Sequence, residues 1–246
     1  GAGMHFRKKH NPAIAGVLLL LVIGFIGFMA YEKGAAQQKQ AALARMYVRK
    51  PQVILDAGHG GMDSGAVSAA GICEKDLNLE ITNRIRGLMK FCGVETVMTR
   101  DDDSTLLYEE GVSVRKNKQN DLYGRVQVAE KYQDSDFISI HMNEFEQAKY
   151  SGAQVFYGLK SGDSENLALL MQEALRVALN PENNRRAKPA PSSIYIMQKI
   201  TSPAVIAECG FLSNPEEAAL LTKADYQKKG SLAIVSSYLC FLAQRT

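Results

Sequence analysis

Two histidines and a glutamate stand at the ends of strand-like segments in this sequence. Of the four histidines, only His59 and His141 follow the N-terminal basic and apolar region, and each ends an apolar run. Glu208 ends a third run, AVIAE. The carboxyl ends of parallel strands form one edge of a sheet, where ligands bind. A carboxylate taken out of water there is costly unless it is paired or bound to a metal, although Glu208 could simply mark where the strand reaches solvent.

Helix periodicity adds a second carboxylate to this group. In EKDLNLEITNRIRGLMKFC the apolar residues from Leu77 to Cys92 recur every three or four positions, which predicts an amphipathic helix. Projection at about 100° per residue places Glu74 on the buried stripe, in the first turn. A glutamate that only starts a helix would face water, so we interpret Glu74 as a metal ligand. Two imidazoles and one carboxylate leave a fourth position open, which is typical of catalytic zinc.

The remaining residues of the predicted site follow from this chemistry. Zinc lowers the pKa of a bound water to about 7, and a carboxylate outside the metal shell then accepts the proton. Glu208 fits that role, so the residues predict metal-assisted hydrolysis. Asp56 and Asn143 flank the histidines and are candidates for orienting them, with turn formation as the alternative. GHGGMDSGA lacks the Lys-Ser/Thr of a phosphate loop and the glycine order of a dinucleotide site.

Short apolar runs alternate with amphipathic stretches through most of the chain. This alternation predicts one α/β domain with a twisted, mostly parallel sheet of about six strands flanked by helices. The expected strands cover 53–58, 94–99, 136–141, 153–158, 193–198 and 204–208; the expected helices cover 75–91, 121–132, 164–179, 215–222 and 225–243. The segment 101–120 fits neither period, and we expect either a binding loop or a solvated excursion there.

The N-terminal region predicts a membrane segment. Residues 1–11 form a basic tail, in which 1–3 look like a cloning remnant, and 12–31 are apolar enough to cross a bilayer. The basic flank favours a cytoplasmic N-terminus, and a cleaved signal peptide is the alternative. Residues 32–50 are predicted to be a stalk and 51–246 the catalytic domain. We therefore expect the domain to be membrane-anchored or exported, outside the cytoplasmic membrane.

Charge and cysteine content exclude some functions. A net charge of +3 without a clustered basic helix gives no support for nucleic-acid binding. Cys73, Cys92, Cys209 and Cys240 show no CxxC spacing, so cysteine ligation of zinc is not expected. These cysteines either form disulfides or remain reduced as small apolar residues.

The motifs around the candidate residues resemble one enzyme family. DAGHGG, CEKDLNLE, ISIHMN and AECGFLSNPEE are together similar to the zinc-dependent N-acetylmuramoyl-L-alanine amidases, from about Pro51 to the C-terminus. The resemblance implies that His59, Glu74 and His141 bind one zinc ion and that Glu208 is the catalytic glutamate. It also implies a twisted, mostly parallel sheet. The implied substrate is peptidoglycan, cleaved between N-acetylmuramic acid and L-alanine.

Two further stretches of sequence resemble one subgroup of this family. YSGAQVFYG and NRRAKPAPSSIYIMQKITSPAVIAECGFLSN are similar to the germination-specific, spore-cortex members of the family. That similarity implies cortex maturation in the spore envelope, with muramic δ-lactam completed by a separate peptidoglycan deacetylase. Ser64 and Cys209 depart from the residues usual in the family. The alternatives are a vegetative amidase or autolysin, a zinc peptidase or deacetylase on the same polymer, and a wall-binding module that needs an accessory, activating protein.

Overall fold

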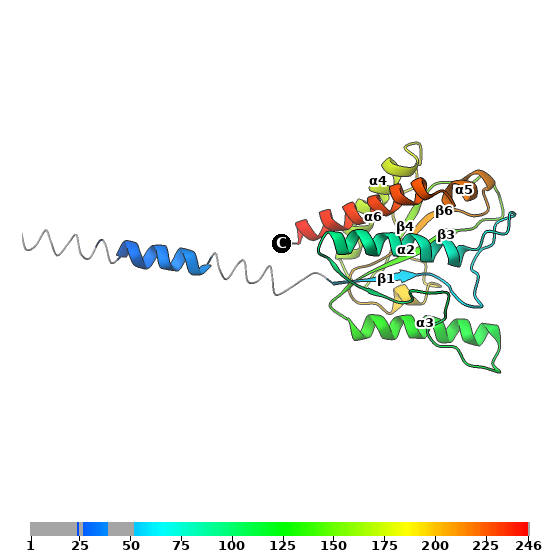
Figure 1. Cartoon of the computed structure of the whole chain (residues 1–246), viewed down its shortest axis with the longest axis horizontal. Coiled ribbons are helices and arrows are strands. Elements are labelled where there is room, and N and C mark those ends of the chain that lie inside the picture. Colours follow the sequence, from blue (N-terminus) through cyan, green and yellow to red (C-terminus); the bar gives the residue numbers. More distant parts are fainter. Residues whose placement is uncertain (1–23, 25–26, 39–51, 246) are drawn as a thin grey trace, which may run out of the picture. The chain divides into compact units, whose positions relative to one another are not determined.

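The computed structural model describes residues 24, 27–38 and 52–245. Residues 27–38 are helical, and Pro51–Thr246 forms a compact unit of its own (Figure 1). Most of the predicted membrane segment and stalk lies outside the described residues. Among the helices that the structure describes, none combines the length and apolar character needed to cross a membrane.

A six-stranded sheet forms the centre of this unit, in the order β2-β1-β3-β6-β4-β5. The strands β2, β1, β3 and β6 are parallel, whereas β4 runs antiparallel to β6 and parallel to β5. The carboxyl ends of the three central strands β1, β3 and β6 therefore meet at one edge, as the sequence predicted. The bounds are β1 Gln52–Ala57, β2 Glu95–Met98, β3 Asp136–Asn143, β4 Gln154–Tyr157, β5 Lys188–Pro189 and β6 Ala204–Phe211.

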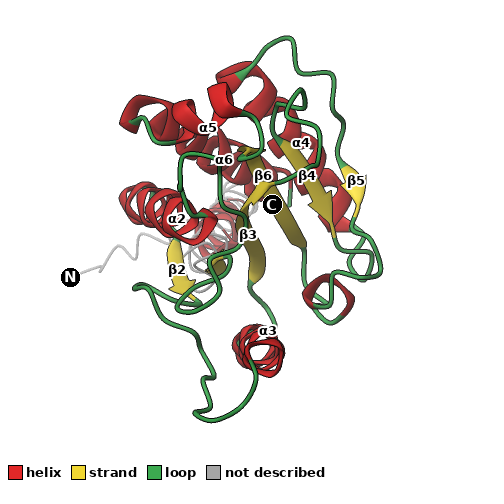
Figure 2. Ribbon diagram, turned by 90° about the vertical axis from the view of Figure 1, so that its right-hand side faces the viewer, coloured by secondary structure: helices red, strands yellow, loops and turns green. Residues whose placement is uncertain are grey.

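Helices cover both faces of the sheet (Figure 2). One face carries α2 (Glu74–Phe91), α4 (Asp163–Leu179) and α6 (Ala224–Gln244), and α5 (Pro215–Leu221) follows β6 on this side. The other face carries α3 (Val114–Lys131) and the short 3₁₀ helix η1 (Ile196–Gln198). This arrangement confirms the predicted α/β class.

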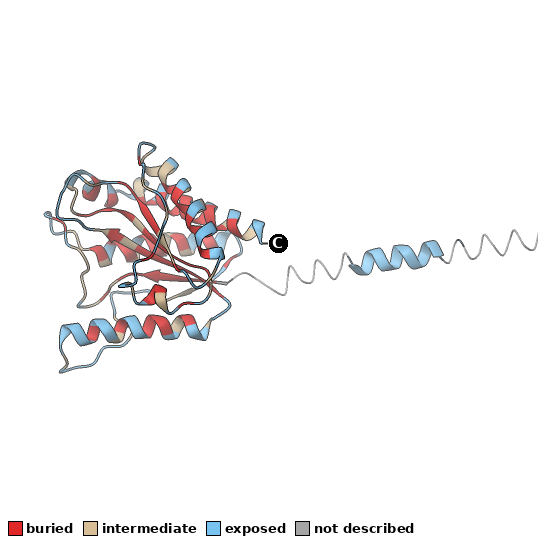
Figure 3. Ribbon diagram, turned by 180° about the vertical axis from the view of Figure 1, so that it is seen from behind, coloured by how far each residue is buried: buried red, intermediate tan, exposed pale blue. Residues whose placement is uncertain are grey.

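Burial on both faces explains why the strands are apolar without alternation. Val53 and Leu55 of β1 belong to the core under α2, α4 and α6, whereas Ile54 belongs to the smaller core under α3. Residues of a strand point alternately to opposite faces, so a strand covered twice must be apolar at every position. The central strands are accordingly buried along almost their whole length (Figure 3).

Two segments differ from the sequence-based expectation. The predicted strand at 193–198 is wrong: its C-terminal half is η1, whose Ile196 and Met197 cover the sheet from outside, and the sixth strand is β5. Helix α3 begins at Val114, so the second half of the expected loop 101–120 is helical. Ser113 caps it by accepting from the backbone N–H of Lys116.

The expected helix at 121–132 corresponds to the C-terminal part of α3, whereas the polar contacts of its first turns hide residues 114–120 from a periodicity search. Its buried residues include Asn117, Asp121 and Arg125 next to Val126 and Ala129, so the buried face is mostly polar. A helix of this kind has no apolar stripe in its first turns. The structure contains the four cysteines without a disulfide bond between them.

Candidate active site

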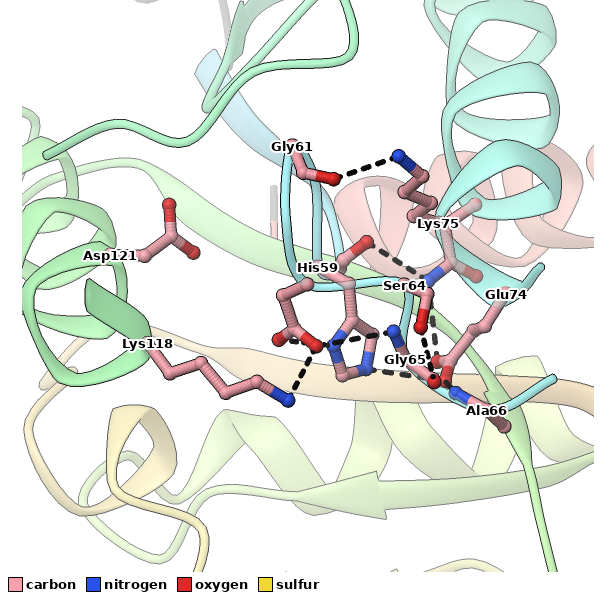
Figure 4. A network of polar contacts seen from close by, with 12 residues as sticks. His59, Gly61, Ser64, Gly65, Ala66, Glu74, Lys75, Lys118 and Asp121 are labelled. Carbon is pink, nitrogen blue, oxygen red and sulfur yellow. Dashed lines mark hydrogen bonds and ion pairs between the residues drawn. The ribbon is translucent and has the colours of Figure 1, made fainter. Parts of the chain in front are cut away.

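His59 lies in the turn that follows β1, between two carboxylates (Figure 4). Its Nδ1 is 2.8 Å from Oδ2 of Asp63, and its Nε2 is 3.2 Å from Oε2 of Glu74. The backbone φ of His59 is 61°, a left-handed value that is uncommon for a residue with a side chain. Such strain is found at functional sites, where the surrounding structure holds it in place. Here it turns the imidazole toward Glu74.

Glu74 is held from several directions at the start of α2, and only 3% of the residue is exposed. Its Oε2 accepts from the backbone N–H of Ala66 at 2.9 Å, and its Oε1 accepts from that of Met142 at 3.0 Å. Oε1 also lies 2.9 Å from Nδ1 of His141. The predicted position of Glu74 on the buried stripe is confirmed. Its carboxylate faces the end of β3, not water.

His141 completes a group of three. Its ring packs against that of His59 at a T-shaped angle, with 5.0 Å between centroids. Gly58 makes this possible, because a Cβ there would lie 2.2 Å from Nε2 of His141. Donor atoms of His59, Glu74 and His141 lie within 4.8 Å of one another.

The donor set fits a zinc ion. Tetrahedral zinc with bonds of about 2.0–2.1 Å to nitrogen and oxygen requires its ligands to stand roughly 3.3 Å apart. The nitrogen–oxygen contacts of Glu74 with His59 and His141, at 3.2 and 2.9 Å, are close to that spacing. The structure therefore brings together the three predicted ligands, with Asp63 bound to the far nitrogen of His59, as is usual for a metal-bound histidine.

Glu208 stands beside this cluster on β6, directly opposite His141 on β3. Its Oε2 is buried and has no hydrogen-bond partner within the described part of the chain. Burial raises the pKa of Glu208 to about 7, with a smaller upward contribution from Glu74 and opposition from both histidines. A buried polar atom left without a partner needs an explanation. A water or substrate proton at the metal would supply the missing partner.

The metal-free cluster carries a proton that a metal must displace. Burial disfavours the charged imidazole of His59, but the carboxylates of Asp63 and Glu74 outweigh it and raise its pKa to about 9. Burial likewise opposes ionisation of Glu74, and the hydrogen bonds from His141 and His59 nonetheless hold its pKa well below the usual range. Zinc binding would take the place of the proton on the His59 imidazole, so that proton would be released when the metal binds.

Asp56 belongs to a different network from the one expected. Its carboxylate accepts from Thr99 Oγ1 at 2.7 Å and from Ser139 Oγ at 2.5 Å, and it forms an ion pair with Arg125. None of its recorded hydrogen bonds reaches a histidine ring, so its expected role in orienting a histidine is not what the structure displays. Arg125 instead connects Asp56 to the backbone of His59, because its Nη2 donates to the carbonyl of His59 at 2.7 Å.

Asp63 is the orienting residue that the sequence reasoning missed. It lies four positions after His59, in HGGMD, and also pairs with Lys118 of α3 at 2.7 Å. The acidic residue at that short spacing was the only signal in the sequence. For Asn143, the backbone carbonyl accepts from the N–H of Leu212 at 2.9 Å. A role for its side chain in orienting a histidine stays a prediction.

The first half of the segment 101–120 contacts the turn that carries His59. Asp103 accepts from the backbone N–H of Gly61 at 2.8 Å and pairs with Lys75 at 2.6 Å. Lys75 also donates to the carbonyl of Gly61 at 2.8 Å (Figure 4). Arg100 donates to the carbonyls of Ala57 and Gly58. Arg100 therefore holds the backbone before His59, and Asp103 of the loop holds the backbone after it.

Comparison with known proteins identifies the family. Residues 53–237 match the family model described as N-acetylmuramoyl-L-alanine amidase. The chain belongs to this family. The match contains the whole candidate site, and the predicted resemblance is confirmed.

Individual relatives agree with this assignment. The amidase is 38% identical over 193 residues to the germination-specific N-acetylmuramoyl-L-alanine amidase of Bacillus subtilis, covering 78% of this chain and 80% of the relative. Among solved structures it is similar to the CwlD amidase of Clostridioides difficile in complex with the GerS lipoprotein. That similarity has a TM-score of 0.76 and 40% identity, covering 79% of this chain and 99% of the other. The AmiC2 amidase of Nostoc punctiforme aligns with a TM-score of 0.66 and 28% identity, over 79% and 98% of the two chains.

Proposed function

We propose that this amidase uses one zinc ion to hydrolyse the amide between N-acetylmuramic acid and L-alanine in spore-cortex peptidoglycan. The observation that carries the proposal is the buried carboxyl group of Glu208 beside the His59–Glu74–His141 cluster, whose Oε2 has no hydrogen-bond partner among the described residues. A structural metal site has four protein ligands, whereas a catalytic one has three and an open position. A carboxylate beside the open position is what amide hydrolysis requires.

Each residue has a separate task in this reaction. His59, Glu74 and His141 would hold the zinc, which when bound would polarise the scissile carbonyl and lower the pKa of water. Glu208 accepts a proton from the attacking water and delivers it to the departing nitrogen of L-alanine. In the metal-free protein burial raises the pKa of Glu208 to about 7, and a carboxyl group that titrates near neutral pH can both accept and release a proton.

The cortex role rests on the relatives. Relatives with 38–40% identity include a germination-specific amidase and an amidase whose structure is of a complex with a lipoprotein. For this chain we propose action on cortex peptidoglycan and an accessory protein on the basis of these relatives. We further propose that a separate deacetylase completes muramic δ-lactam and that residues 12–31 hold the catalytic domain outside the cytoplasmic membrane.

Product analysis tests the reaction. The purified protein is incubated with peptidoglycan, with zinc and then with a chelator, and the products are measured by mass spectrometry. We expect free stem peptides that begin at L-alanine, lost with the chelator and restored by zinc. Peptides cut at a later bond would indicate a peptidase instead, and loss of acetyl groups alone would indicate a deacetylase.

Spores test the cellular role. Deletion of the gene is expected to remove muramic δ-lactam from cortex peptidoglycan while leaving vegetative wall fragments unchanged. An altered vegetative wall with normal δ-lactam would favour the autolysin alternative. Protease accessibility of the domain in intact protoplasts tests whether it lies outside the membrane.

A further inference from the structure

A row of polar residues continues past Glu208 toward the edge of the sheet. Gln154 of β4 is the register partner of Glu208 in the antiparallel pair β4–β6. Directly opposed residues point to the same face of a sheet. The side chain of Gln154 accepts, at its Oε1, a hydrogen bond from Nη1 of Arg185 at 3.2 Å. His141, Glu208, Gln154 and Arg185 therefore follow one another across one face.

The guanidinium of Arg185 is fixed in place. Its Nε donates to the carbonyl of Ser151 at 3.0 Å. Its central carbon lies 4.5 Å from the centroid of the Phe211 ring and 5.8 Å from that of Tyr150, within cation–π distance. Phe211 ends β6, three residues after Glu208, so these contacts lie at the same edge as the metal cluster. Preorganisation of this kind lowers the entropic cost of binding an anion.

Arg185 forms no ion pair with a carboxylate in the part of the chain that the structure describes. Its charge acts on Glu217 without an ion-pair contact, where it opposes the burial that raises the pKa of that carboxyl group. No ion pair is found for it among the residues 52–245. The carboxylate of Glu217 is engaged by the backbone N–H groups of Gly152 and Phe211. Arginine carries five N–H donors, and the contacts to Ser151 and Gln154 use two. The three remaining donors suit a carboxylate, which a guanidinium binds with two parallel hydrogen bonds.

The distance between the metal cluster and Arg185 indicates which carboxylate of the substrate Arg185 could bind. Strands are about 4.8 Å apart, so Gln154 on β4 lies two spacings, roughly 10 Å, from His141 on β3. Arg185 contacts the side chain of Gln154 and is therefore at a comparable distance. Two extended residues span about 7 Å, and a charge-assisted hydrogen bond adds about 2.8 Å. In a stem peptide whose second residue is a γ-linked glutamate, the first free carboxylate beyond L-alanine is the α-carboxylate of that residue. The distance that this carboxylate and its hydrogen bond span from the scissile amide, about 10 Å, agrees with the two strand spacings.

We propose that Arg185 binds the α-carboxylate of the second residue of the stem peptide. This inference rests on the proposed function and adds to it the direction of the substrate. The peptide extends from the metal cluster over Glu208 and Gln154 to Arg185. The glycan then lies on the opposite side, toward the loop that contains Asp103.

A matched pair of substrates tests the inference. Two muropeptides are used that differ only in whether the α-carboxylate of the second residue is free or amidated. The native enzyme is expected to prefer the free acid in kcat/KM by roughly 10- to 100-fold, the range for a hydrogen bond to a charged group. Arg185→Met is expected to lose activity on the free acid and to retain it on the amide. Arg185→Lys is expected to keep part of the preference.

The control variant is Arg186→Met, because Arg186 is an exposed neighbour whose backbone carbonyl, not its side chain, contacts Gln154. It should keep the native preference. If Arg185→Met reduces activity on both substrates equally, or if the native enzyme does not discriminate, Arg185 only supports the loop around Ser151 and the inference is wrong.

A binding measurement separates this inference from the proposed reaction. The same two muropeptides are titrated calorimetrically into zinc-loaded Glu208→Gln protein, with and without Arg185→Met. An affinity difference that depends on Arg185, together with no cleavage by the native protein, would leave the carboxylate site standing and reject the hydrolysis. Equal affinities for both muropeptides would reject the carboxylate site, whatever the native protein cleaves.

Discussion

His141 and Glu208 occupy paired positions on the neighbouring parallel strands β3 and β6. A candidate ligand and a candidate base are therefore one strand apart on the same face, with their spacing set by backbone hydrogen bonds and not by a flexible loop. A site supported by sheet strands is held more firmly than one built from loops.

Replacing Glu208 should separate metal binding from catalysis. Glu208→Gln is expected to keep one zinc per chain and to lose at least about 100-fold in kcat, because proton transfer by a positioned group contributes about 10²- to 10⁴-fold. Zinc is measured by atomic absorption and turnover by release of stem peptide. Near-native turnover in Glu208→Gln would remove Glu208 from the role of base.

The same substitution should stabilise the metal-free protein at alkaline pH. The pKa of Glu208 rises on folding from 4.5 to about 7, so the folded state binds more protons and stability falls as the pH rises through that window. The difference corresponds to about 3 kcal/mol at pH 8 and about 1 kcal/mol at pH 5. Urea unfolding with chelator present should therefore favour Glu208→Gln increasingly with pH. A pH-independent difference would show that the carboxyl is not perturbed.

Removing the candidate ligand His59 should reduce zinc binding more than removing Asp63, which only orients His59. His59→Ala is expected to lose bound zinc and activity together. Asp63→Asn, which weakens the hydrogen bond to the far nitrogen of His59, is expected to lower zinc affinity about 10- to 100-fold with the stoichiometry retained. Lys118→Met is the control, since its half-exposed ammonium contacts only the outer side of Asp63. Unchanged zinc content in His59→Ala would exclude His59 as a ligand.

Adding one methyl group at Gly58 should disrupt the cluster. The new Cβ would lie 2.2 Å from Nε2 of His141, a distance that real structures do not tolerate, so the ring must move. Gly58→Ala is expected to lose zinc binding and to destabilise the fold by about 1–3 kcal/mol. The matched control is Gly87→Ala in α2, which has open space around it and should stabilise the helix by about 0.5–1 kcal/mol. Full zinc occupancy in Gly58→Ala would contradict the close approach.

The buried pair Asp56–Arg125 should behave as a unit. Removing Arg125 leaves the buried carboxylate of Asp56 without its cation, at a cost of about 3–5 kcal/mol. Removing Asp56 costs less, because Arg125 keeps its ion pair with Asp121 at 2.7 Å. Arg125→Met is therefore expected to reduce the free energy of unfolding more than Asp56→Asn does, and the double variant by less than the sum of the two. Denaturant unfolding of the three variants measures the coupling. Simple additivity would mean that the pair carries no interaction energy of its own.

Sequence patterns predicted the site better than they predicted the edges of the fold. The strand ends that carry His59, His141 and Glu208 follow buried apolar runs, and Glu74 lies on a regular apolar stripe, so local periodicity is enough to place them. Each of these features can be recognised within a single segment of the sequence, without knowledge of its tertiary contacts.

What the sequence did not reveal depends on contacts between distant segments. The first turns of α3 are buried through Asn117 and Asp121, which accept from or donate to the loop before them, and polar burial leaves no apolar period. The apolar residues near Ile196 are buried against α3 without forming a strand. Asp56 is engaged by Arg125, 69 positions away, which no spacing rule indicates.

The close packing of the turn after β1 also limits how this enzyme can be redesigned. A Cβ at Gly58 would collide with His141, and one at Gly65 would lie 2.4 Å from Oε2 of Glu74. Directed evolution of substrate preference therefore has little sequence space available within the turn itself. Variation that preserves the metal cluster has to come from the rim, for example from the exposed segment 144–149, where side chains can change without touching the three ligands.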